Sequence, residues 1–230
     1  MPQLLFIHGI LGKPDYFGFL HKYVPESYRI TEILLEEHGG SQKDFARASM
    51  SKWRKQVTDT VQNLRKDVDR LVIVAHSMGT LFAIDSAVRG EADALFLLNP
   101  PLSLRITRRL LTTPLKIIRG KIDERWTLAA KEAYSISDDP NLLHYIAWIP
   151  RYLELFREIS RTRKIAGKLS VKTRVYLSAH DEMVSPRSAK LFPSKPDISV
   201  TSLPDSGHYC YDDADRSVIV SDFSDFLENF

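Results

Sequence analysis

A serine at the end of a buried segment has the clearest chemical potential in this chain. Residues 71–75 form an uninterrupted apolar run rich in β-branched side chains, which is typical of a buried parallel strand. Ser77 follows in the pattern Ala75-x-Ser77-x-Gly79, with a small residue two positions away on either side. A serine raised on a tight turn between strand and helix needs such neighbours. The pattern predicts a nucleophilic hydroxyl, although a serine here could also cap the next helix.

A carboxylate and a histidine follow Ser77 in the order that a catalytic triad of this kind requires. Asp181 lies directly after an expected strand, with Glu182 as the reserve candidate. His208 lies in a short loop before the last expected helix, behind a glycine that permits a tight turn, and it alone among seven histidines follows both serine and acid. We therefore predict that His208 accepts the Ser77 proton and returns it to a leaving group. Asp181 would orient the imidazole and stabilise the imidazolium.

Acyl transfer also needs hydrogen-bond donors for the negatively charged oxygen of its intermediate. One candidate is the backbone N–H of Met78, directly after the serine. The other should come from the loop after an early strand, where the chain has His8-Gly9-Ile10-Leu11-Gly12. The glycines of this loop let backbone amides turn inward, and the Ile10 N–H is the expected donor.

Length and composition limit the class of protein. A chain of 230 residues accommodates one well-buried α/β domain, alone or with an insertion. No apolar run approaches the roughly 20 residues that span a bilayer, and no secretory signal is visible. The single cysteine, Cys210, excludes an internal disulfide framework, so a cytoplasmic location is expected. Zinc-type Cys/His clusters, a P-loop and a G-x-G-x-x-G motif are missing, so we expect no metal, no cofactor and no nucleic-acid partner.

Strand-like and helix-like segments alternate along most of the chain, which favours a mostly parallel sheet with helices on both faces. The expected strands lie at residues 4–7, 28–34, 71–75, 94–98, 173–178 and 198–203. The expected core helices lie at about 15–23, 44–66, 78–89 and 214–230. In the last helix we expect four side chains to face inward, namely those of Val218, Phe223, Phe226 and Leu227.

The alternation breaks once, between the expected strands at 94–98 and 173–178. More than 70 residues separate them, whereas a whole βαβ unit needs about 30. The intervening residues are helical in composition and contain three prolines that we expect at helix boundaries, Pro114, Pro140 and Pro150. We expect a core at 1–102 and 171–230 and a helical cap insertion at 103–170. Such a cap would lie over the carboxyl ends of the strands, where α/β sheets bind ligands, although it could be only an extra packing layer.

Charge is distributed unevenly although the net charge is only +3. Residues 103–174 contain 16 Lys and Arg against 7 Asp and Glu, while the rest of the chain contains 16 against 22. Such an asymmetry either marks an anionic partner or belongs to a solvated helix face.

These motifs together resemble the α/β-hydrolase superfamily, specifically its capped serine esterase and monoacylglycerol lipase-like branch. The resemblance covers nearly the whole chain and rests on residues 8–12, 76–79 and 206–208 and on Asp181 with Val184 and Pro186. A turn at 37–41 also resembles the family's G-H-G-x-S, with Glu37 in place of its first glycine. It implies an α/β-hydrolase fold with Ser77 as nucleophile, Asp181 as acid and His208 as base. It also implies oxyanion amides at Ile10 and Met78.

The sequence departs from the family pattern in three places. Ala75 replaces the glycine that usually begins the tight turn around the nucleophilic serine, called the nucleophile elbow. The family's first hairpin has no counterpart before residue 4, so we expect a shortened N-terminal sheet. The loop Asn99-Pro100-Pro101 offers no carboxylate, which argues against an acid at that alternative position. Serine at the elbow also disfavours the epoxide hydrolase and dehalogenase branches, which carry aspartate there.

The expected activity is hydrolysis of carboxylic esters with small to medium acyl chains through an acyl-serine intermediate. Apolar and aromatic residues of the cap could line an acyl pocket or could be the core of the cap itself. Two alternatives stay open. The basic insertion would suit an acyl-CoA thioesterase, and the same scaffold could serve as a ligand receptor with slow turnover. The expected partner is a small-molecule ester, without stable membrane insertion, and the oligomeric state is not predicted.

Overall fold

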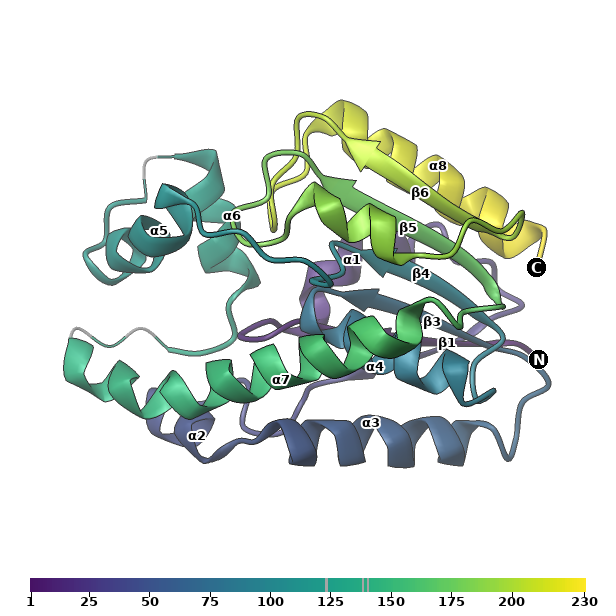
Figure 1. Ribbon diagram of the computed structural model, residues 1–230, viewed down its shortest axis with the longest axis horizontal. Helices are drawn as coiled ribbons and strands as arrows, with labels where there is room; N and C mark the ends of the chain where they lie inside the picture. The colour runs from purple at the N-terminus through teal and green to yellow at the C-terminus, as the bar shows by residue number, and fades with distance from the viewer. Residues whose placement is uncertain (123, 138, 140) are drawn as a thin grey trace.

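Six parallel strands form one sheet in the order β2-β1-β3-β4-β5-β6 (Figure 1). The computed structural model describes residues 1–122, 124–137, 139 and 141–230. The strands are β1 (Gln3–Ile7), β2 (Arg29–Ile33), β3 (Leu71–His76), β4 (Ala94–Leu98), β5 (Lys172–Ser178) and β6 (Ile198–Leu203). Each matches an expected strand to within two residues. The predicted α/β fold with a parallel sheet is therefore confirmed.

Helices cover both faces of this sheet. The helices that follow the strands of the core are η1 (Pro14–Phe17), α1 (Gly18–His21), α2 (Gln42–Arg47), α3 (Met50–Leu64), α4 (Met78–Val88), η3 (Pro186–Leu191) and α8 (Asp213–Glu228). In Figure 1, α3 and α4 lie on one face and α8 on the other, with α1 packed beside α8. Because both faces are covered, β1, β3 and β4 are buried at every position, which explains their continuous apolar sequences.

The last helix corrects one prediction. Phe223, Phe226 and Leu227 are buried as expected, but Val218 is 43 % exposed. Its neighbour Ile219 is fully buried instead. Ile219 lies four and seven residues before Phe223 and Phe226, the spacing that places side chains on one helix face, whereas Val218 lies one position away from that face.

The single helix expected at 44–66 is also wrong, because two helices occupy this range. Helix α2 ends at Arg47, and Ala48 has an extended backbone with ψ 168°. Ser49 then caps α3, its side chain accepting a hydrogen bond from the N–H of Lys52. A serine cap supplies an acceptor for an otherwise unpaired N–H at a helix start, so the chain can turn here at little cost.

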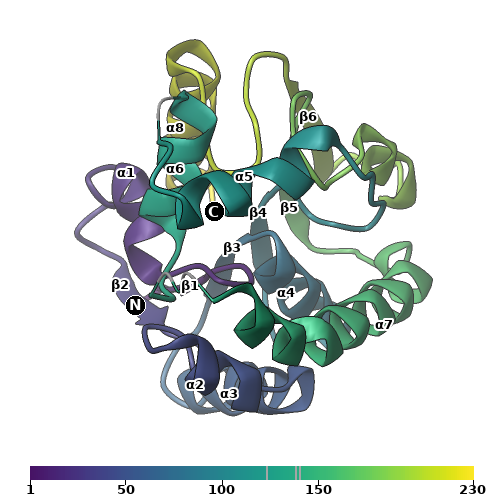
Figure 2. The same cartoon turned by 90° about the vertical axis from the view of Figure 1, so that its left-hand side faces the viewer.

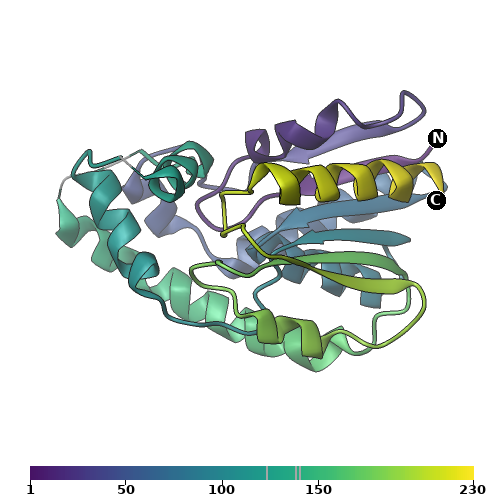
Figure 3. The same cartoon turned by 90° about the horizontal axis from the view of Figure 1, so that it is seen from above.

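The described residues between β4 and β5, where we expect a cap, form four helices. They are α5 (Arg108–Ile118), α6 (Arg125–Ala133), η2 (Leu142–Trp148) and α7 (Ile149–Ala166). Figures 1 and 3 show α5 and α6 beyond the carboxyl ends of the strands, and α7 running from there back along α4. Figure 2 looks onto this end of the molecule, with α5 and α6 on one side and α7 on the other.

The prolines of this insertion behave differently from one another. Pro150 lies in the first turn of α7, as expected for a helix boundary. Pro114 lies inside α5, so the expected boundary there is wrong. Ile117, almost one turn later, is only 3 % exposed, so the buried face of α5 continues past the proline and offsets the backbone hydrogen bond that it lacks. Pro140 lies outside the described residues.

Buried charges hold α7 against α3 and α4. The Glu158 carboxylate is 2 % exposed and forms ion pairs with Arg54 of α3 and, at 2.8 Å, with Arg161. Arg161 also reaches Asp85 of α4, 2.8 Å away. Buried ions require partners of opposite sign, so this network fixes α7 relative to the core.

Candidate active site

Ser77 stands on a strained turn between β3 and α4. Its backbone has φ 50° and ψ −123°, a conformation that residues with a side chain seldom adopt. The turn is held on both sides, since the N–H of Ser77 donates to the carbonyl of Leu98 at 2.9 Å, and its own carbonyl accepts from the Thr80 hydroxyl at 2.6 Å. This geometry raises the serine above the carboxyl ends of the strands, as the elbow pattern predicts.

Glycine is required near Ser77 because backbone segments approach closely there. A Cβ atom on Gly79 would lie 2.3 Å from the carbonyl oxygen of Ile7 and 2.7 Å from that of His8. A Cβ atom on Gly9 would lie 2.8 Å from the Cβ of Ser77. The start of α4 and the loop after β1 therefore meet with no room for a methyl group. This contact brings the loop of residues 8–12 beside the serine.

The structure brings the three predicted triad residues together from three distant loops. His208 Nε2 lies 2.9 Å from Ser77 Oγ, and His208 Nδ1 lies 2.6 Å from Asp181 Oδ2. Asp181 is fully buried, and its other oxygen accepts hydrogen bonds from the N–H groups of Met183 and Val184 at 2.8 and 2.6 Å. These donors stabilise an ionised carboxylate, which in turn keeps the proton of a neutral His208 ring on Nδ1. Nε2 is then free to accept the serine proton.

Glu182, the reserve candidate for the acid, has a different place beside the same histidine. Its Oε2 accepts a hydrogen bond from the backbone N–H of His208 at 2.9 Å, and it does not hold the ring. Burial alone would lower the pKa of His208, but the charge of Asp181, its hydrogen bond and the charge of Glu182 together raise that pKa above the ordinary value. Two carboxylates thus favour the protonated ring.

Sequence analysis missed the residue that anchors the His208 loop from below. Asn99, directly after β4, is fully buried with φ 50°. Its amide donates to the carbonyls of Gly207 and His208 at 3.4 and 3.3 Å, and its oxygen accepts from the N–H of Ser178 at 2.8 Å. Asparagine tolerates positive φ better than most residues, so its position between a buried strand and two prolines was an available signal.

The glycine before His208 also has a reason that the sequence did not reveal. Gly207 was expected to allow a tight turn, yet its φ lies outside the left-handed region. A Cβ atom on Gly207 would instead lie 2.6 Å from Cζ3 of Trp126 in α6. The guanidinium groups of Arg109 and Arg125 lie over the Trp126 ring, at 4.5 and 4.3 Å from the ring centre. Glycine here permits the insertion to touch the histidine loop.

The two predicted oxyanion amides are open. Among the described residues, neither the N–H of Ile10 nor that of Met78 has a hydrogen-bond acceptor. The adjoining peptide is firmly held, since the N–H of Leu11 donates to His38 Nε2 at 3.2 Å and the carbonyl of Ile10 accepts from the Tyr209 hydroxyl at 3.3 Å. The orientation of the Ile10 amide is therefore fixed by two neighbours that sequence analysis did not assign.

A pair of buried neutral histidines supports this loop. His8 Nδ1 donates to the carbonyl of Gly9 at 2.8 Å, and its Nε2 accepts from the N–H of Leu35 at 3.0 Å. The His38 ring packs edge-on against His8, with centroids 4.8 Å apart. Burial lowers the pKa of His8 to about 4, and burial, with a smaller electrostatic effect of the neighbouring His8, lowers the pKa of His38 to about 3. Both rings stay neutral, as acceptance at Nε2 requires.

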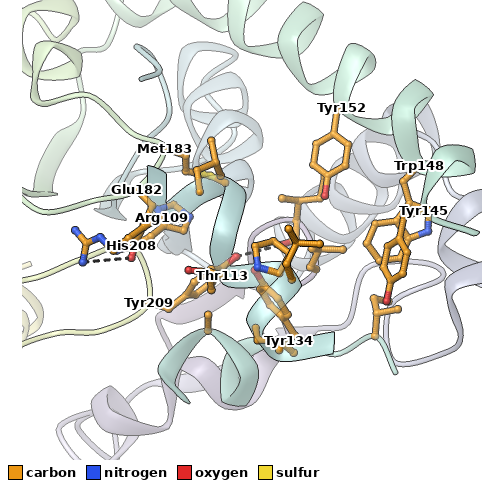
Figure 4. A pocket seen from close by; sticks show the side chains of 18 of the residues that line it. Arg109, Thr113, Tyr134, Tyr145, Trp148, Tyr152, Glu182, Met183, His208 and Tyr209 are labelled. Carbon is orange, nitrogen blue, oxygen red and sulfur yellow. Dashed lines mark hydrogen bonds and ion pairs between the residues drawn. The ribbon is translucent and has the colours of Figure 1, made fainter. Parts of the chain in front are cut away.

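A cavity of about 540 Å³ opens beside His208 (Figure 4). Its wall is mainly apolar and comes from the loop of residues 8–12, the loop of residues 182–183 and the helices of the insertion. Five of the six aromatic residues of the insertion line this cavity, namely Tyr134, Tyr145, Trp148, Tyr152 and Phe156. Trp126 packs on Gly207 instead.

Two further features bear on the chemistry and the surroundings of this site. Within the part of the chain that the structure describes, no group of three or more His, Cys, Asp or Glu side chains could hold a metal ion. Over the same residues, no helix has both the length and the apolar character needed to cross a bilayer. An arrangement of serine, imidazole and carboxylate with two open amides can perform acyl transfer on its own side chains.

Comparison with known proteins agrees with this geometry. The sequence matches the model of the alpha/beta hydrolase family over residues 4–219. The chain belongs to the alpha/beta hydrolase family. A search of curated proteins found none that matches this alpha/beta hydrolase in sequence.

Solved structures share the fold of this alpha/beta hydrolase at low sequence identity. A structure from a study of LipS and LipT, two metagenome-derived lipolytic enzymes, superposes with a TM-score of 0.75 at 16 % identity, covering 100 % of this chain and 94 % of the other. The monoacylglycerol lipase of Paleococcus ferrophilus gives 0.68 at 14 % identity, covering 99 % and 95 %. A soluble variant of the Saccharomyces cerevisiae monoglyceride lipase gives 0.68 at 14 % identity, covering 99 % and 86 %.

Proposed function

We propose that this alpha/beta hydrolase is a serine esterase that cleaves carboxylic esters of small to medium acyl chains, such as simple esters or monoacylglycerols. The observation that carries the proposal is the chain of hydrogen bonds from Ser77 through His208 to Asp181, at the edge of an apolar cavity. The similarity to structures of lipolytic enzymes and monoacylglycerol lipases supports the choice of an ester substrate.

The proposed reaction proceeds in two halves. His208 Nε2 takes the proton of Ser77 as Oγ attacks the ester carbonyl, and the carbonyl oxygen becomes an oxyanion bound by the N–H groups of Ile10 and Met78. The tetrahedral intermediate collapses, the bond to the alcohol oxygen breaks, and the imidazolium gives its proton to the leaving alcohol. His208 then takes a proton from water, which attacks the acyl-serine carbonyl. The bond between the acyl carbon and Ser77 Oγ breaks, the imidazolium returns its proton to Oγ, and the acid is released. Asp181 stays ionised throughout and stabilises the imidazolium.

We further propose that residues 103–170 act as a cap on a core formed by residues 1–102 and 171–230. The cavity wall supports this division, because side chains of α5 and α7 enclose the space beside His208. A volume of about 540 Å³ falls within the range of roughly 300–1,000 Å³ that small-molecule pockets occupy. The cap would therefore supply most of the surface that contacts the acyl group.

An acyl-CoA thioesterase is the second candidate. Its support is electrostatic, because residues 103–174 are strongly basic and two of their arginines, Arg105 and Arg109, are among the residues that line the cavity. Such charges would attract a polyphosphate. Turnover of p-nitrophenyl esters and of acyl-CoAs of equal chain length separates the two candidates. Faster turnover of the thioesters, weakened by added salt, would reverse the ranking.

Replacing the proposed nucleophile tests the proposed function directly. We expect Ser77→Ala to reduce kcat/KM for p-nitrophenyl butyrate by about 1,000-fold or more, because the residue that forms the covalent intermediate is gone. Thermal unfolding followed by circular dichroism should change little, and an organophosphonate should label the wild-type protein at Ser77 by mass spectrometry.

Ser86→Ala is a matched control for this experiment. Ser86 lies on α4, is 1 % exposed and has a hydroxyl without a hydrogen-bond partner, so its loss should leave hydrolysis intact. Full activity in Ser77→Ala, or an adduct on another residue, would exclude the proposed nucleophile. Tight ester binding without turnover in the wild type would instead indicate the slow ligand receptor.

A further inference from the structure

Tyr152 places a hydroxyl group in the wall of the apolar cavity with no partner in the protein. The residue lies on α7 and lines the cavity. Figure 4 shows its ring projecting from α7 with the oxygen directed toward the middle of the lining side chains. Among the described residues, none forms a hydrogen bond with this oxygen. The hydroxyl is therefore available to whatever fills the cavity.

Three other aromatic residues of the same wall have their polar groups engaged in hydrogen bonds. The Tyr145 hydroxyl donates to the carbonyl of Asp139 at 3.2 Å, and the Trp148 indole N–H donates to the carbonyl of Gln42 at 3.0 Å. The Tyr209 hydroxyl is bound to Ile10. Tyr152 thus differs from its neighbours in having a free hydroxyl, and Thr113 of α5 adds a second free hydroxyl to the wall.

Binding of a purely hydrocarbon ligand would leave the Tyr152 hydroxyl without a hydrogen-bond partner. An alkyl chain that filled the cavity would displace water from the Tyr152 oxygen and offer nothing in return. Leaving a hydroxyl unpaired in an apolar environment costs free energy, because the group loses its hydrogen bonds to water. Phenylalanine would line an alkyl pocket without that cost, so tyrosine at this position favours a ligand with a polar atom opposite it.

We infer that the cavity is built for oxygenated acyl groups, in which an ether, keto or hydroxyl oxygen within the acyl chain accepts a hydrogen bond from the Tyr152 hydroxyl. This inference rests on the proposed esterase function and specifies its substrate class. Burial, with a smaller effect of Tyr145, raises the pKa of Tyr152 to about 12, so the hydroxyl keeps its proton and can donate.

A series of oxa-esters tests the inference with little change in shape. We would compare p-nitrophenyl octanoate with isomers in which one methylene of the acyl chain is replaced by oxygen, moved along the chain one position at a time. We expect at least one isomer to exceed octanoate in kcat/KM by about 10-fold, since a site with a polar group discriminates strongly against a ligand that leaves it unpaired. Tyr152→Phe should abolish that preference and raise the rate with octanoate.

Tyr145→Phe is the matched control, because it removes a hydroxyl from the same wall that is already bound to Asp139. It should change the rates with both esters by the same factor and so keep the preference. Equal rates for octanoate and every oxa-isomer in the wild type, or a preference that survives Tyr152→Phe, would overturn the inference.

Binding separates this inference from the proposed function. Calorimetry with the Ser77→Ala variant measures the affinity for intact methyl octanoate and its oxa-isomers without turnover. Tighter binding of one oxa-isomer supports the inference even if hydrolysis is never seen, and equal binding contradicts it. If the organophosphonate did not label Ser77 in the wild type, the proposed function would be overturned but the inference about Tyr152 would not. If Tyr152→Phe did not fold, the calorimetric comparison would still decide.

Discussion

At the scale of single residues, His208 is held by two carboxylates that do different things. Asp181 binds the ring and fixes which nitrogen carries the proton, whereas Glu182 binds the backbone N–H of the same residue. Arg105 supports this arrangement by donating to the carbonyls of Asp181 and Ala179, at 2.9 and 2.7 Å. The acid and its neighbour are therefore parts of one clamped turn beside the histidine.

The pH dependence of hydrolysis should show how the two carboxylates affect the pKa of His208. A general base must be neutral, so kcat/KM falls as the pH drops through the pKa of His208. Because that pKa is raised, the acid limb should lie above pH 6.5, the ordinary value. Glu182→Gln keeps an oxygen for the His208 N–H but removes a charge that favours the imidazolium, so the acid limb should move to lower pH.

The comparison needs a variant that changes charge elsewhere. Glu228→Gln, exposed at the end of α8, should leave the acid limb where the wild type has it. An unmoved or raised limb in Glu182→Gln would show that this carboxylate does not set the pKa of the base.

At the scale of elements, the site depends on the contact between the start of α4 and the end of β1. Their backbones meet at Gly79, where a Cβ atom would fall 2.3 Å from a carbonyl oxygen. The same contact orients the loop of residues 8–12 and so its open amide. Since backbone atoms cannot move aside as flexible side chains can, this close approach admits glycine alone.

Gly79→Ala should therefore destabilise the protein by about 3 kcal/mol or more, the upper range for overpacking, and abolish hydrolysis by separating the serine from the amide of Ile10. Gly18→Ala is the matched control, because nothing lies within 4 Å of its Cβ position and its φ of −52° is helical. That substitution should stabilise the protein by about 0.4–1 kcal/mol. Urea unfolding of both variants measures the difference, and a stable, active Gly79→Ala would contradict the packing argument.

At the scale of the whole molecule, the arrangement depends on histidines that stay neutral inside the fold. Burial lowers the pKa of His8 to about 4 and of His38 to about 3, and it places the pKa of His76 well below 6.5. His76 connects the elbow to the histidine loop, its Nε2 donating to the carbonyl of His208 at 3.0 Å. The hydrogen bonds and packing of these three rings connect the end of β1 with the turn at 35–38, and the turn around Ser77 with the His208 loop.

The free energy of unfolding should consequently fall as the pH drops below about 6.5. Below this pH His8 and His38 bind protons in the unfolded chain but stay neutral in the folded protein. Acid therefore favours unfolding until the pH approaches the pKa values of about 3–4 that these histidines have in the fold. At pH 5 each of His8 and His38 should cost about 2 kcal/mol relative to pH 7.5. The raised pKa of His208 acts oppositely, adding stability that is complete below pH 6.5 and lost as the pH rises through its folded pKa.

Urea unfolding at pH 5 and 7.5 measures this loss, and NMR of the histidine rings identifies its source. The His8 and His38 signals should remain those of neutral imidazole at pH 5. Equal stability at the two pH values, or rings that protonate near pH 6.5, would show that these histidines are not tied into the fold as neutral groups.

The sequence by itself determined where most strands and helices lie and the order of the proposed catalytic residues along the chain. Continuous apolar runs encode strands buried on both faces and located β1, β3 and β4, whereas alternating, β-branched residues located β2, which is partly exposed. Ser77, Asp181 and His208 follow strand ends in the order that the resemblance implies, so their meeting could be predicted. The sequence was misread where one residue pattern is compatible with two structures. One helix was expected where α2 and α3 are separate, and Val218 was expected to be buried where Ile219 is.

Only the tertiary structure decided which groups meet across the molecule. Asn99 supports a loop more than 100 residues later, and Trp126 of the insertion explains Gly207. Nothing in the sequence marks the Tyr152 hydroxyl as free among bound neighbours. The physical reason is one of range. Periodicity fixes how a segment turns and which face it buries, whereas a hydrogen bond between distant segments depends on a few ångströms of packing that no local pattern records.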